Sequence, residues 1–216
     1  MRAQGASELC TLIEARVAEF GHVNVATALR ALLQARRDGV PRKVVERALQ
    51  ALEAAALRTI DAFGAQQICN TLHIMAKTRY RPWDLTLVPE LEGRAEALAG
   101  TFNAQNVANT LWAYATMGRE PGAGVMKGLE GRAEALGGMF NAQNVANLLW
   151  AYATMGREPG VGMMRALEGR AEALAGTFNA QEVANTLWAY ATMGRKPGAG
   201  VMRALERRAE ALGGSG

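Results

Sequence analysis

Apolar and polar positions recur along this chain with the period of an α-helix, in blocks separated by glycine and proline. In residues 102–118, Val107 and Leu111 begin an apolar side, Asn103 suits an N-cap and Gly118 suits a C-cap. We name this predicted helix helix A. Its apolar side carries Val107, Ala108, Leu111, Trp112, Tyr114 and Ala115. The other side carries Gln105, Asn106, Asn109, Thr110, Ala113, Thr116 and Met117.

A second helix, helix B, is predicted directly after helix A. Pro121 suits its first position, Val125 and Leu129 lie on its apolar face, and Gly137 and Gly138 end it. Its internal glycines each cost about 1 kcal/mol of helix propensity relative to alanine. Either this helix packs very closely on a neighbour or its first turn is loose.

The pair of helices recurs at a fixed spacing of 38 residues, since Phe102, Phe140 and Phe178 open near-identical segments. Degenerate copies precede them, and periods of 20–50 residues are typical of stacked repeats. We predict an all-α, right-handed α-solenoid of about 11 helices, because each pair buries its apolar stripe only against its neighbours. The predicted parts of the single array 1–216 are a capping helix (1–19) and repeats 20–62, 63–101, 102–139, 140–177 and 178–216.

Composition excludes several classes of protein. Half of the residues are apolar and a fifth are charged, which indicates a folded chain, and no apolar run is long enough to span a membrane. The formal net charge of +4 is compatible with a nucleic-acid partner without indicating one. Cys10 and Cys69 lie in different repeats, which favours a reducing compartment, cytoplasmic or organellar. The last residues lack a polar capping helix, so we expect a fragment of a longer array or end-to-end stacking.

The pattern A-Q-x-[VI]-A-N-x-L-W-A-x-A in helix A, with a proline opening helix B, resembles the octotricopeptide repeat. The matching letters are Ala104, Gln105, Val107, Ala108, Asn109, Leu111, Trp112, Ala113 and Ala115. Known members of that family are organellar RNA-binding proteins that act on particular transcripts, with relatives in some bacteria. The resemblance covers 102–216 well, 63–101 fairly and 20–62 weakly. The near-identity of the last three units indicates recent duplication, as in some bacterial effector-like proteins, or a consensus design.

Two positions of helix A differ among the three clean copies, four residues apart and therefore on one face. The first holds Asn106, Asn144 and Glu182, and the second holds Thr110, Leu148 and Thr186. The degenerate units continue the two series with Gln67 and Thr71, and with Asn24 and Ala28. In modular RNA binders each repeat addresses one base with two or three side chains. We therefore predict that the residues of these series, Ala28 apart, contact bases, over about four or five nucleotides.

Each of these assignments has a structural alternative. The first position is the third residue of helix A, where Asn, Gln or Glu completes a capping box, and the second can be tolerated drift. The unvarying Gln105, Asn109 and Thr116, with Asn147 and Asn185, favour a ladder that ties neighbouring backbones together. Trp112, Trp150 and Trp188 are interpreted as core between helices, with base stacking as the alternative.

Arginines at the end of helix A are candidates for phosphate contacts. Arg119, Arg157 and Arg195 each follow the capping glycine, and Arg79 and Arg81 hold the equivalent turn upstream. A ladder of guanidinium groups can follow a phosphate backbone. The alternative is that each arginine offsets the dipole of its helix beside Glu120 or Glu158.

Nothing in the sequence indicates catalysis. His22 and His73 have no partners at metal-ligand spacing, and no nucleophile, metal site or cofactor motif is present, so we expect no enzyme and no cofactor. The favoured function is sequence-selective binding of single-stranded RNA, acting by occupancy in post-transcriptional regulation. The alternative is a scaffold for a protein partner, and in that case a bacterial effector delivered into a host cell. Met117, Met155 and Met193 would suit such an adaptable surface.

Overall fold

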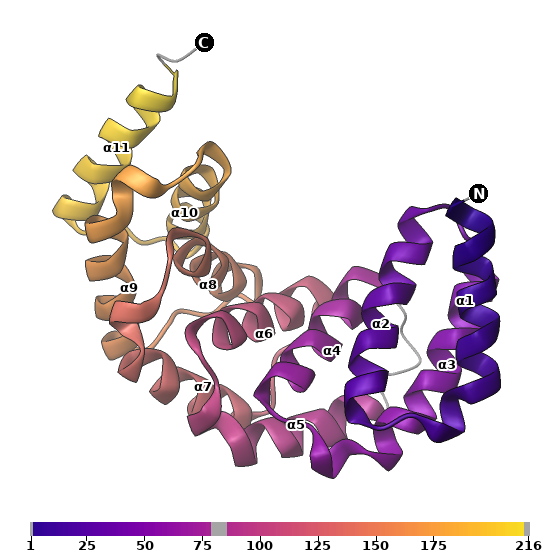
Figure 1. Ribbon diagram of the computed structural model, residues 1–216. Helices are drawn as coiled ribbons and strands as arrows, with labels where there is room; N and C mark the ends of the chain where they lie inside the picture. The colour runs from indigo at the N-terminus through magenta and orange to yellow at the C-terminus, as the bar shows by residue number, and fades with distance from the viewer. Residues whose placement is uncertain (1, 79–85, 214–216) are drawn as a thin grey trace. The chain divides into compact units, whose positions relative to one another are not determined.

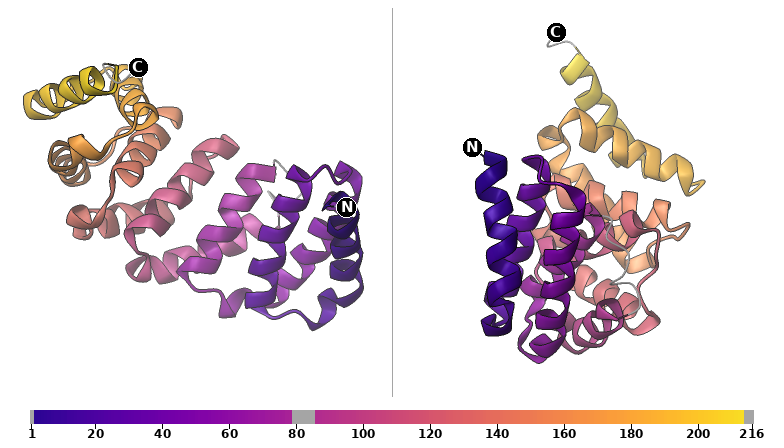
Figure 2. Two further views of the ribbon diagram at one scale, coloured as in Figure 1. Left: turned by 45° about the horizontal axis from the view of Figure 1, so that its top comes forward. Right: turned by 90° about the vertical axis from the view of Figure 1, so that its right-hand side faces the viewer.

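The computed structural model describes residues 2–78 and 86–213, with the side chains of residues 2 and 3 excepted. These residues form eleven α-helices joined by short turns and 3-10 helices, and no strand occurs among them. Consecutive helices pack on one another as antiparallel pairs, which confirms the all-α solenoid (Figures 1 and 2). The chain divides into two compact units, residues 1–98 and residues 99–216, which are described separately.

Unit 1 begins with the predicted capping helix and holds two of the A helices. The capping helix is α1 (Arg2–Arg16), and the A helices are α2 (His22–Arg37) and α4 (Ala65–Thr78). The B helices are α3 (Arg42–Arg58) and α5 (Leu87–Leu98). Helix α2 packs on α4, and α3 packs on α1 and α5, so the A and B helices form two layers (Figure 1). The predicted opening of a helix at 81–85 lies outside the described residues.

Unit 2 contains the three near-identical repeats. Its A helices are α6 (Ala104–Met117), α8 (Ala142–Thr154) and α10 (Ala180–Thr192). Its B helices are α7 (Ala123–Ala135), α9 (Val161–Leu174) and α11 (Ala199–Gly213). The strongest packing in the unit joins α6 to α8 and α8 to α10, so the A helices form one layer. The B helices form a second layer beside it (Figure 1).

The A helices of unit 2 begin and end where their capping residues predict. In α6 the Asn103 side chain accepts a hydrogen bond from the backbone N–H of Asn106, and the Asn106 side chain accepts one from the N–H of Asn103. This reciprocal capping box recurs at α8 and α10. At the other end Gly118 has a φ of 68°, a left-handed conformation that glycine adopts without steric cost.

Helix B starts later than predicted, because α7 begins at Ala123 with Gly122 as its N-cap, so that Pro121 lies before the helix. After four of the B helices, α3, α5, α7 and α9, the chain makes a single turn of 3-10 helix that the sequence did not indicate. These turns are Ile60–Ala62, Ala99–Thr101, Gly137–Met139 and Ala175–Thr177. The turn at Ala99–Thr101 packs closely on α7, the helix B that follows. A Cβ added to Gly128 of α7 would lie only 2.8 Å from the Cβ of Ala99. Close packing, not a loose first turn, thus accounts for this glycine.

A phenylalanine anchors the chain just before each of four A helices. Phe63, Phe102, Phe140 and Phe178 have no exposed surface. In every case an arginine of the following helix B donates a hydrogen bond to the phenylalanine carbonyl, as Arg132 does to Phe102 at 2.7 Å. The equivalent pairs are Arg94 with Phe63, Arg170 with Phe140 and Arg208 with Phe178. These bonds fix the turn that sets the start of helix A.

Helix A in unit 2 is buried on two sides, each facing a different neighbour. Ala142, Ala146 and Ala153 of α8 are buried, but their counterparts in α10, the last A helix of the chain, are exposed. This side therefore faces the next A helix. Thr186 and Tyr190 of α10 stay buried and so face the elements that precede or pair with it. In α6 and α8 only a narrow strip between the two buried sides meets solvent, whereas α10 also exposes the side that carries Ala180, Ala184 and Ala191.

Candidate functional site: an exposed strip on the A helices

The second variable position of helix A is buried in each unit that resembles the repeat. Thr71, Thr110, Leu148 and Thr186 have no exposed surface, so the prediction that they contact bases is wrong. The hydroxyls of the three threonines find no hydrogen-bond partner among the described residues. Because an unpaired buried hydroxyl costs about 1–3 kcal/mol, leucine is a natural alternative at this site. Leu148 is thus a packing substitution.

The first variable position serves the helix cap. Asn106 and Asn144 are only 3% and 5% exposed, and each accepts a hydrogen bond from the backbone of its N-cap residue at 3.3 Å. The prediction that these two side chains contact bases is therefore also wrong.

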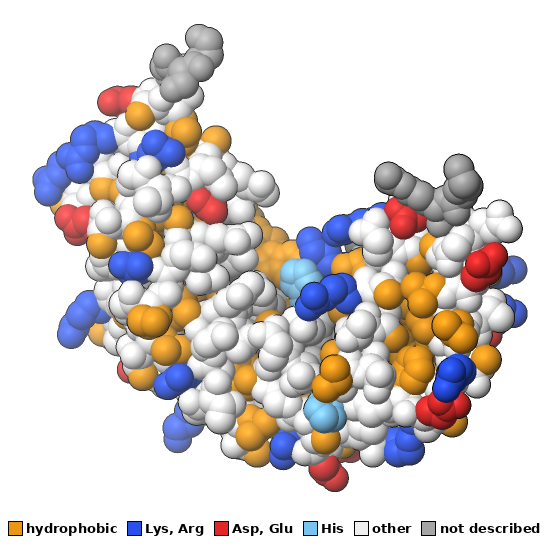
Figure 3. Space-filling view, viewed as in Figure 1, with side chains coloured by type: hydrophobic (Ala, Val, Ile, Leu, Met, Phe, Trp, Pro, Cys, Tyr) orange, Lys and Arg blue, Asp and Glu red, His pale blue; other side chains and the backbone are white. Residues whose placement is uncertain are grey.

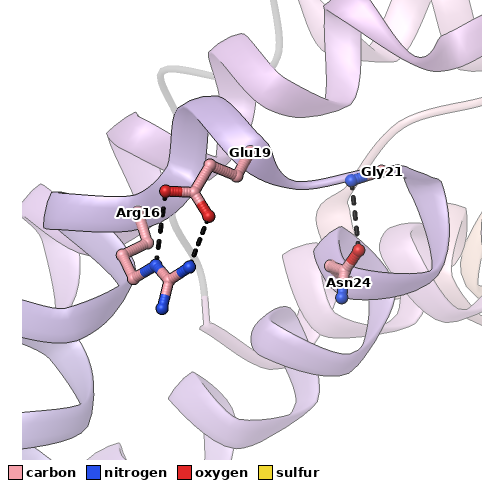
Figure 4. Close-up of polar contacts among 4 residues, drawn as sticks. All are labelled: Arg16, Glu19, Gly21 and Asn24. Carbon is pink, nitrogen blue, oxygen red and sulfur yellow. Dashed lines mark hydrogen bonds and ion pairs between the residues drawn. The ribbon is translucent and has the colours of Figure 1, made fainter.

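The remaining members of this series cap their helices while keeping part of their surface exposed. In each case a side-chain oxygen accepts a hydrogen bond from the backbone N–H of the N-cap residue. The N···O distances are 3.1 Å for Gln67, 2.8 Å for Glu182 and 3.1 Å for Asn24. Figure 4 shows how Asn24 reaches back to the Gly21 amide. For these three residues base contact stays a prediction, but the capping bond already explains why a polar side chain occupies the site.

Each A helix in unit 2 presents a row of four side chains to solvent, which we name the QNWT strip. In α6 it consists of Gln105, Asn109, Trp112 and Thr116, spaced four, three and four residues apart. This spacing places them one above another on the helix surface. The strip in α8 is Gln143, Asn147, Trp150 and Thr154, and the strip in α10 is Gln181, Asn185, Trp188 and Thr192. All twelve side chains are half-buried or exposed.

The tryptophans of the three strips form a row. The ring centroids of Trp112 and Trp150 lie 6.3 Å apart, those of Trp150 and Trp188 lie 6.5 Å apart, and both ring pairs are tilted by 31°. The interpretation of these rings as core between helices holds in part, since they pack on one another across neighbouring A helices, but Trp112 and Trp150 are only half-buried and Trp188 is 46% exposed. Part of each indole therefore meets solvent, and the three rings follow one another at a regular spacing.

The asparagines of the strips do not tie neighbouring backbones together. Asn109, Asn147 and Asn185 make no hydrogen bond to another described residue, which contradicts the predicted structural ladder. Each is half-buried and keeps both an N–H donor and a carbonyl acceptor for an outside partner. An amide beside an indole, once per repeat, is a suitable surface for a planar ligand with polar edges.

In unit 1 the corresponding positions keep the Gln and Asn of the strip in α4 and none of its residues in α2. In α4 it is Gln66, Asn70, His73 and Lys77, and the Gln66 amide donates to the Asn70 carbonyl at 2.8 Å. In α2 it is Val23, Thr27, Arg30 and Gln34. Val23, Thr27, Arg30 and Asn70 line a hollow of about 170 Å³ between these two helices, together with Gln67. The exposed register is therefore the same in both units, but its chemistry is not.

His73 occupies the tryptophan position of the strip in α4. Burial, and to a lesser extent the charges of Lys77 and Arg37, lower its pKa. The folded state therefore favours neutral imidazole, and the unfolded chain binds more protons in mildly acidic solution. Stability is expected to fall as the pH drops through the unfolded-state pKa of about 6.5.

A His73→Gln variant is expected to lose less stability than the parent between about pH 7.5 and pH 5. Urea denaturation midpoints at the two pH values measure this difference. Equal pH dependence in the two proteins would show that His73 does not titrate with folding.

Two of the arginines predicted to contact phosphate, Arg157 and Arg195, pair with glutamates, and phosphate contact stays a prediction. Nη1 of Arg157 lies 2.9 Å from Oε2 of Glu120 in the preceding repeat, and Nη1 of Arg195 lies 2.8 Å from Oε2 of Glu158. Such exposed pairs contribute at most about 1 kcal/mol, so either arginine can exchange its partner for another anion. Arg119, Glu120 and the strip residue Thr154 line one open hollow of about 360 Å³. Arg79 and Arg81 lie outside the described residues.

Charge is spread thinly over the surface. On the face drawn in Figure 3, Lys and Arg side chains lie scattered among neutral ones and do not form one continuous band. In the described ranges, 2–78 and 86–213, no group of three or more His, Cys, Asp or Glu could hold a metal ion. Across the same residues no helix has the length and apolar character to cross a bilayer.

Comparison with known proteins supports a helical repeat without supplying a function. A family model described as a protein of unknown function, DUF1601, matches residues 41–72, 99–111, 138–149 and 175–187. The last three segments cover the 3-10 turn and the first half of each A helix in unit 2, and they end 38 residues apart. They include the glutamine and asparagine of each strip. No curated protein matches the chain.

The strip could have been predicted from the sequence, but not by dividing helix A into one apolar and one polar side. Gln105, Asn109 and Trp112 follow the helical period among themselves, and they lie between the two registers that neighbouring helices bury. A helix in the middle of a solenoid is covered on two sides. The exposed residues are found by dividing the helix surface into three parts, two sides that neighbouring helices bury and one strip between them.

Proposed function

We propose that this protein binds single-stranded RNA along the QNWT strips, about one base per repeat. The observation that carries the proposal is the row of partly exposed indoles, whose ring centroids lie 6.3 and 6.5 Å apart, each with an amide one turn away. Aromatic faces hold unpaired bases by stacking, and the amides of Asn and Gln form paired hydrogen bonds to base edges. The octotricopeptide-like pattern of helix A supports the same partner.

The spacing of the rings suits an extended strand better than a stacked one. Neighbouring bases along one strand of a duplex rise by about 3.4 Å, whereas neighbouring tryptophans are nearly twice as far apart. A strand with its bases unstacked could thus place one base on each indole. Duplex RNA hides its base faces and would not use this surface.

Arginines beside the strips supply the phosphate contacts in this proposal. Arg119 and Thr154 line the same hollow, which brings a cation and a strip residue to the same side of unit 2. Arg157 and Arg195 occupy equivalent turns in the next two repeats. The protein would act by occupying a transcript, shielding it or positioning it.

The proposal is tested by fluorescence anisotropy with a pool of short, random-sequence RNAs at about 50 and 200 mM salt. We expect saturable binding that weakens as salt rises and that exceeds binding to duplex RNA of the same length. Absence of binding at the lower salt, or equal binding to heparin and RNA, would rule out the proposal. A protein-binding scaffold would then be the favoured function, although Met117, one of its three candidate methionines, is only 6% exposed.

An Arg157→Gln variant is expected to bind RNA with a weaker salt dependence. Each phosphate contact contributes about 0.7 to the slope of log K against log salt for a single strand, so the slope should flatten by roughly that amount. The matched control is Glu120→Gln, which removes the partner but keeps the arginine and should not reduce affinity. An unchanged slope in Arg157→Gln would show that this arginine does not contact phosphate.

A further inference from the structure

The three strips of unit 2 present the same chemistry. Each consists of glutamine, asparagine, tryptophan and threonine in the same order along helix A. The two positions of helix A that differ among the repeats are the buried site and the capping site described above. Variation within these helices is therefore buried or engaged in a cap, and the four residues of the strip repeat without change.

The geometry repeats as closely as the residues do. The step from Trp112 to Trp150 and the step from Trp150 to Trp188 differ by only 0.2 Å in distance and share a tilt of 31°. Asn109, Asn147 and Asn185 are each half-buried and without a hydrogen-bond partner among the described residues. Unit 2 thus offers three equivalent sites in a row, and a periodic surface is complementary to a periodic ligand.

We propose that unit 2 recognises a run of three identical bases, and that this base is adenine. The inference rests on the proposed function, because it specifies which single-stranded RNA the strips select. Because the side chains at the three sites are identical, each site prefers the same base. The three sites together therefore select a run of one base and not a mixed sequence. Specificity follows from the amides, since Asn and Gln pair in bidentate fashion with N6 and N7 of adenine.

Stacking favours the same base. A purine covers more of an indole face than a pyrimidine does, and each stacked base contributes to affinity separately. Guanine offers only acceptors, N7 and O6, on the edge that adenine presents to the amide, and is matched by Arg or Lys there instead. No strip in unit 2 carries such a cation, because its four positions are Gln, Asn, Trp and Thr.

Unit 1 does not share this selectivity. Its strips place His73 and Arg30 at the tryptophan position, and Val23 and Thr27 replace the two amides in α2. In α4 Gln66 and Asn70 keep the two amides, but the Gln66 amide donates to the Asn70 carbonyl and no tryptophan accompanies them. The adenine run is therefore assigned to residues 99–216 alone.

The test uses the full chain and four short RNAs that share a cytidine background and differ at three central positions: AAA, ACA, UUU and CCC. Anisotropy titration is expected to give the tightest binding for AAA. Interrupting the run in ACA should weaken binding by about tenfold, as a single mismatched base commonly does. A Gln143→Ala/Asn147→Ala variant, changed only on the strip of α8, should bind AAA and ACA equally.

The outcomes separate this inference from the proposed function. Equal binding of AAA, ACA and CCC by the parent protein would overturn the adenine run while leaving RNA binding intact. Tighter binding of UUU or CCC than of AAA would overturn the choice of adenine. Failure to bind any of the four RNAs, or the random pool, would overturn both proposals.

Discussion

Replacing Trp150 by alanine is expected to weaken RNA binding by about 1–3 kcal/mol, or roughly five- to 150-fold. Trp150 is the middle ring of the row and contacts the indoles of both Trp112 and Trp188. Its removal takes away one stacking surface and interrupts the row between Trp112 and Trp188. Anisotropy titration with the random RNA pool measures the loss.

A Trp150→Phe variant is the control for this change, because it keeps an aromatic face at the same place. Its affinity should stay within a few-fold of the parent. Since Trp150 is half-buried, circular dichroism must show that both variants are folded at the temperature of the titration. A folded Trp150→Ala variant that binds RNA as the parent does would remove the indole row from the proposed site.

The largest expected effect on stability comes from Phe140→Ala. Phe140 has no exposed surface, and its carbonyl accepts a hydrogen bond from Arg170 at the turn before α8. Truncating a buried phenylalanine costs about 3–5 kcal/mol, because the contacts of the ring are lost and a cavity remains. The urea midpoint of unfolding, followed by circular dichroism, should fall accordingly.

The neighbouring residue supplies a matched control for Phe140. Met139 is 72% exposed, so Met139→Ala is expected to change stability by no more than about 0.5 kcal/mol. If the two variants unfolded at the same urea concentration, the phenylalanine would not be the anchor of the repeat.

Local signals in the sequence predicted the helices well. Asn103 and Gly118 mark the two ends of α6, because caps depend on a few adjacent residues. The 3-10 turns and the later start of α7 were not predicted, since they are set by packing between helix B and its neighbour. Gly128, against Ala99, shows this dependence on a residue far away in sequence.

The functional surface was harder to predict, because polarity alone does not report exposure in a solenoid. Thr110 is polar but buried without a partner, and Asn106 is polar because it caps α6. Trp112 is apolar but reaches solvent. Which register faces water depends on how successive A helices pack on each other, which is a property of the array and not of one repeat.

We propose that the strips, and not the two variable positions, contact the ligand. Two double variants of α8, compared for affinity and sequence preference with the random RNA pool, distinguish the two surfaces. Asn144→Glu/Leu148→Thr gives the capping and buried sites of α8 the residues that α10 already holds at Glu182 and Thr186. Gln143→Ala/Asn147→Ala changes only the strip.

We expect the Asn144→Glu/Leu148→Thr protein to bind the pool with the affinity and preference of the parent. The Gln143→Ala/Asn147→Ala protein should bind more weakly and lose its preference at one position. A shifted preference in the first variant, together with parental binding by the second, would contradict the account and return base recognition to the variable pair.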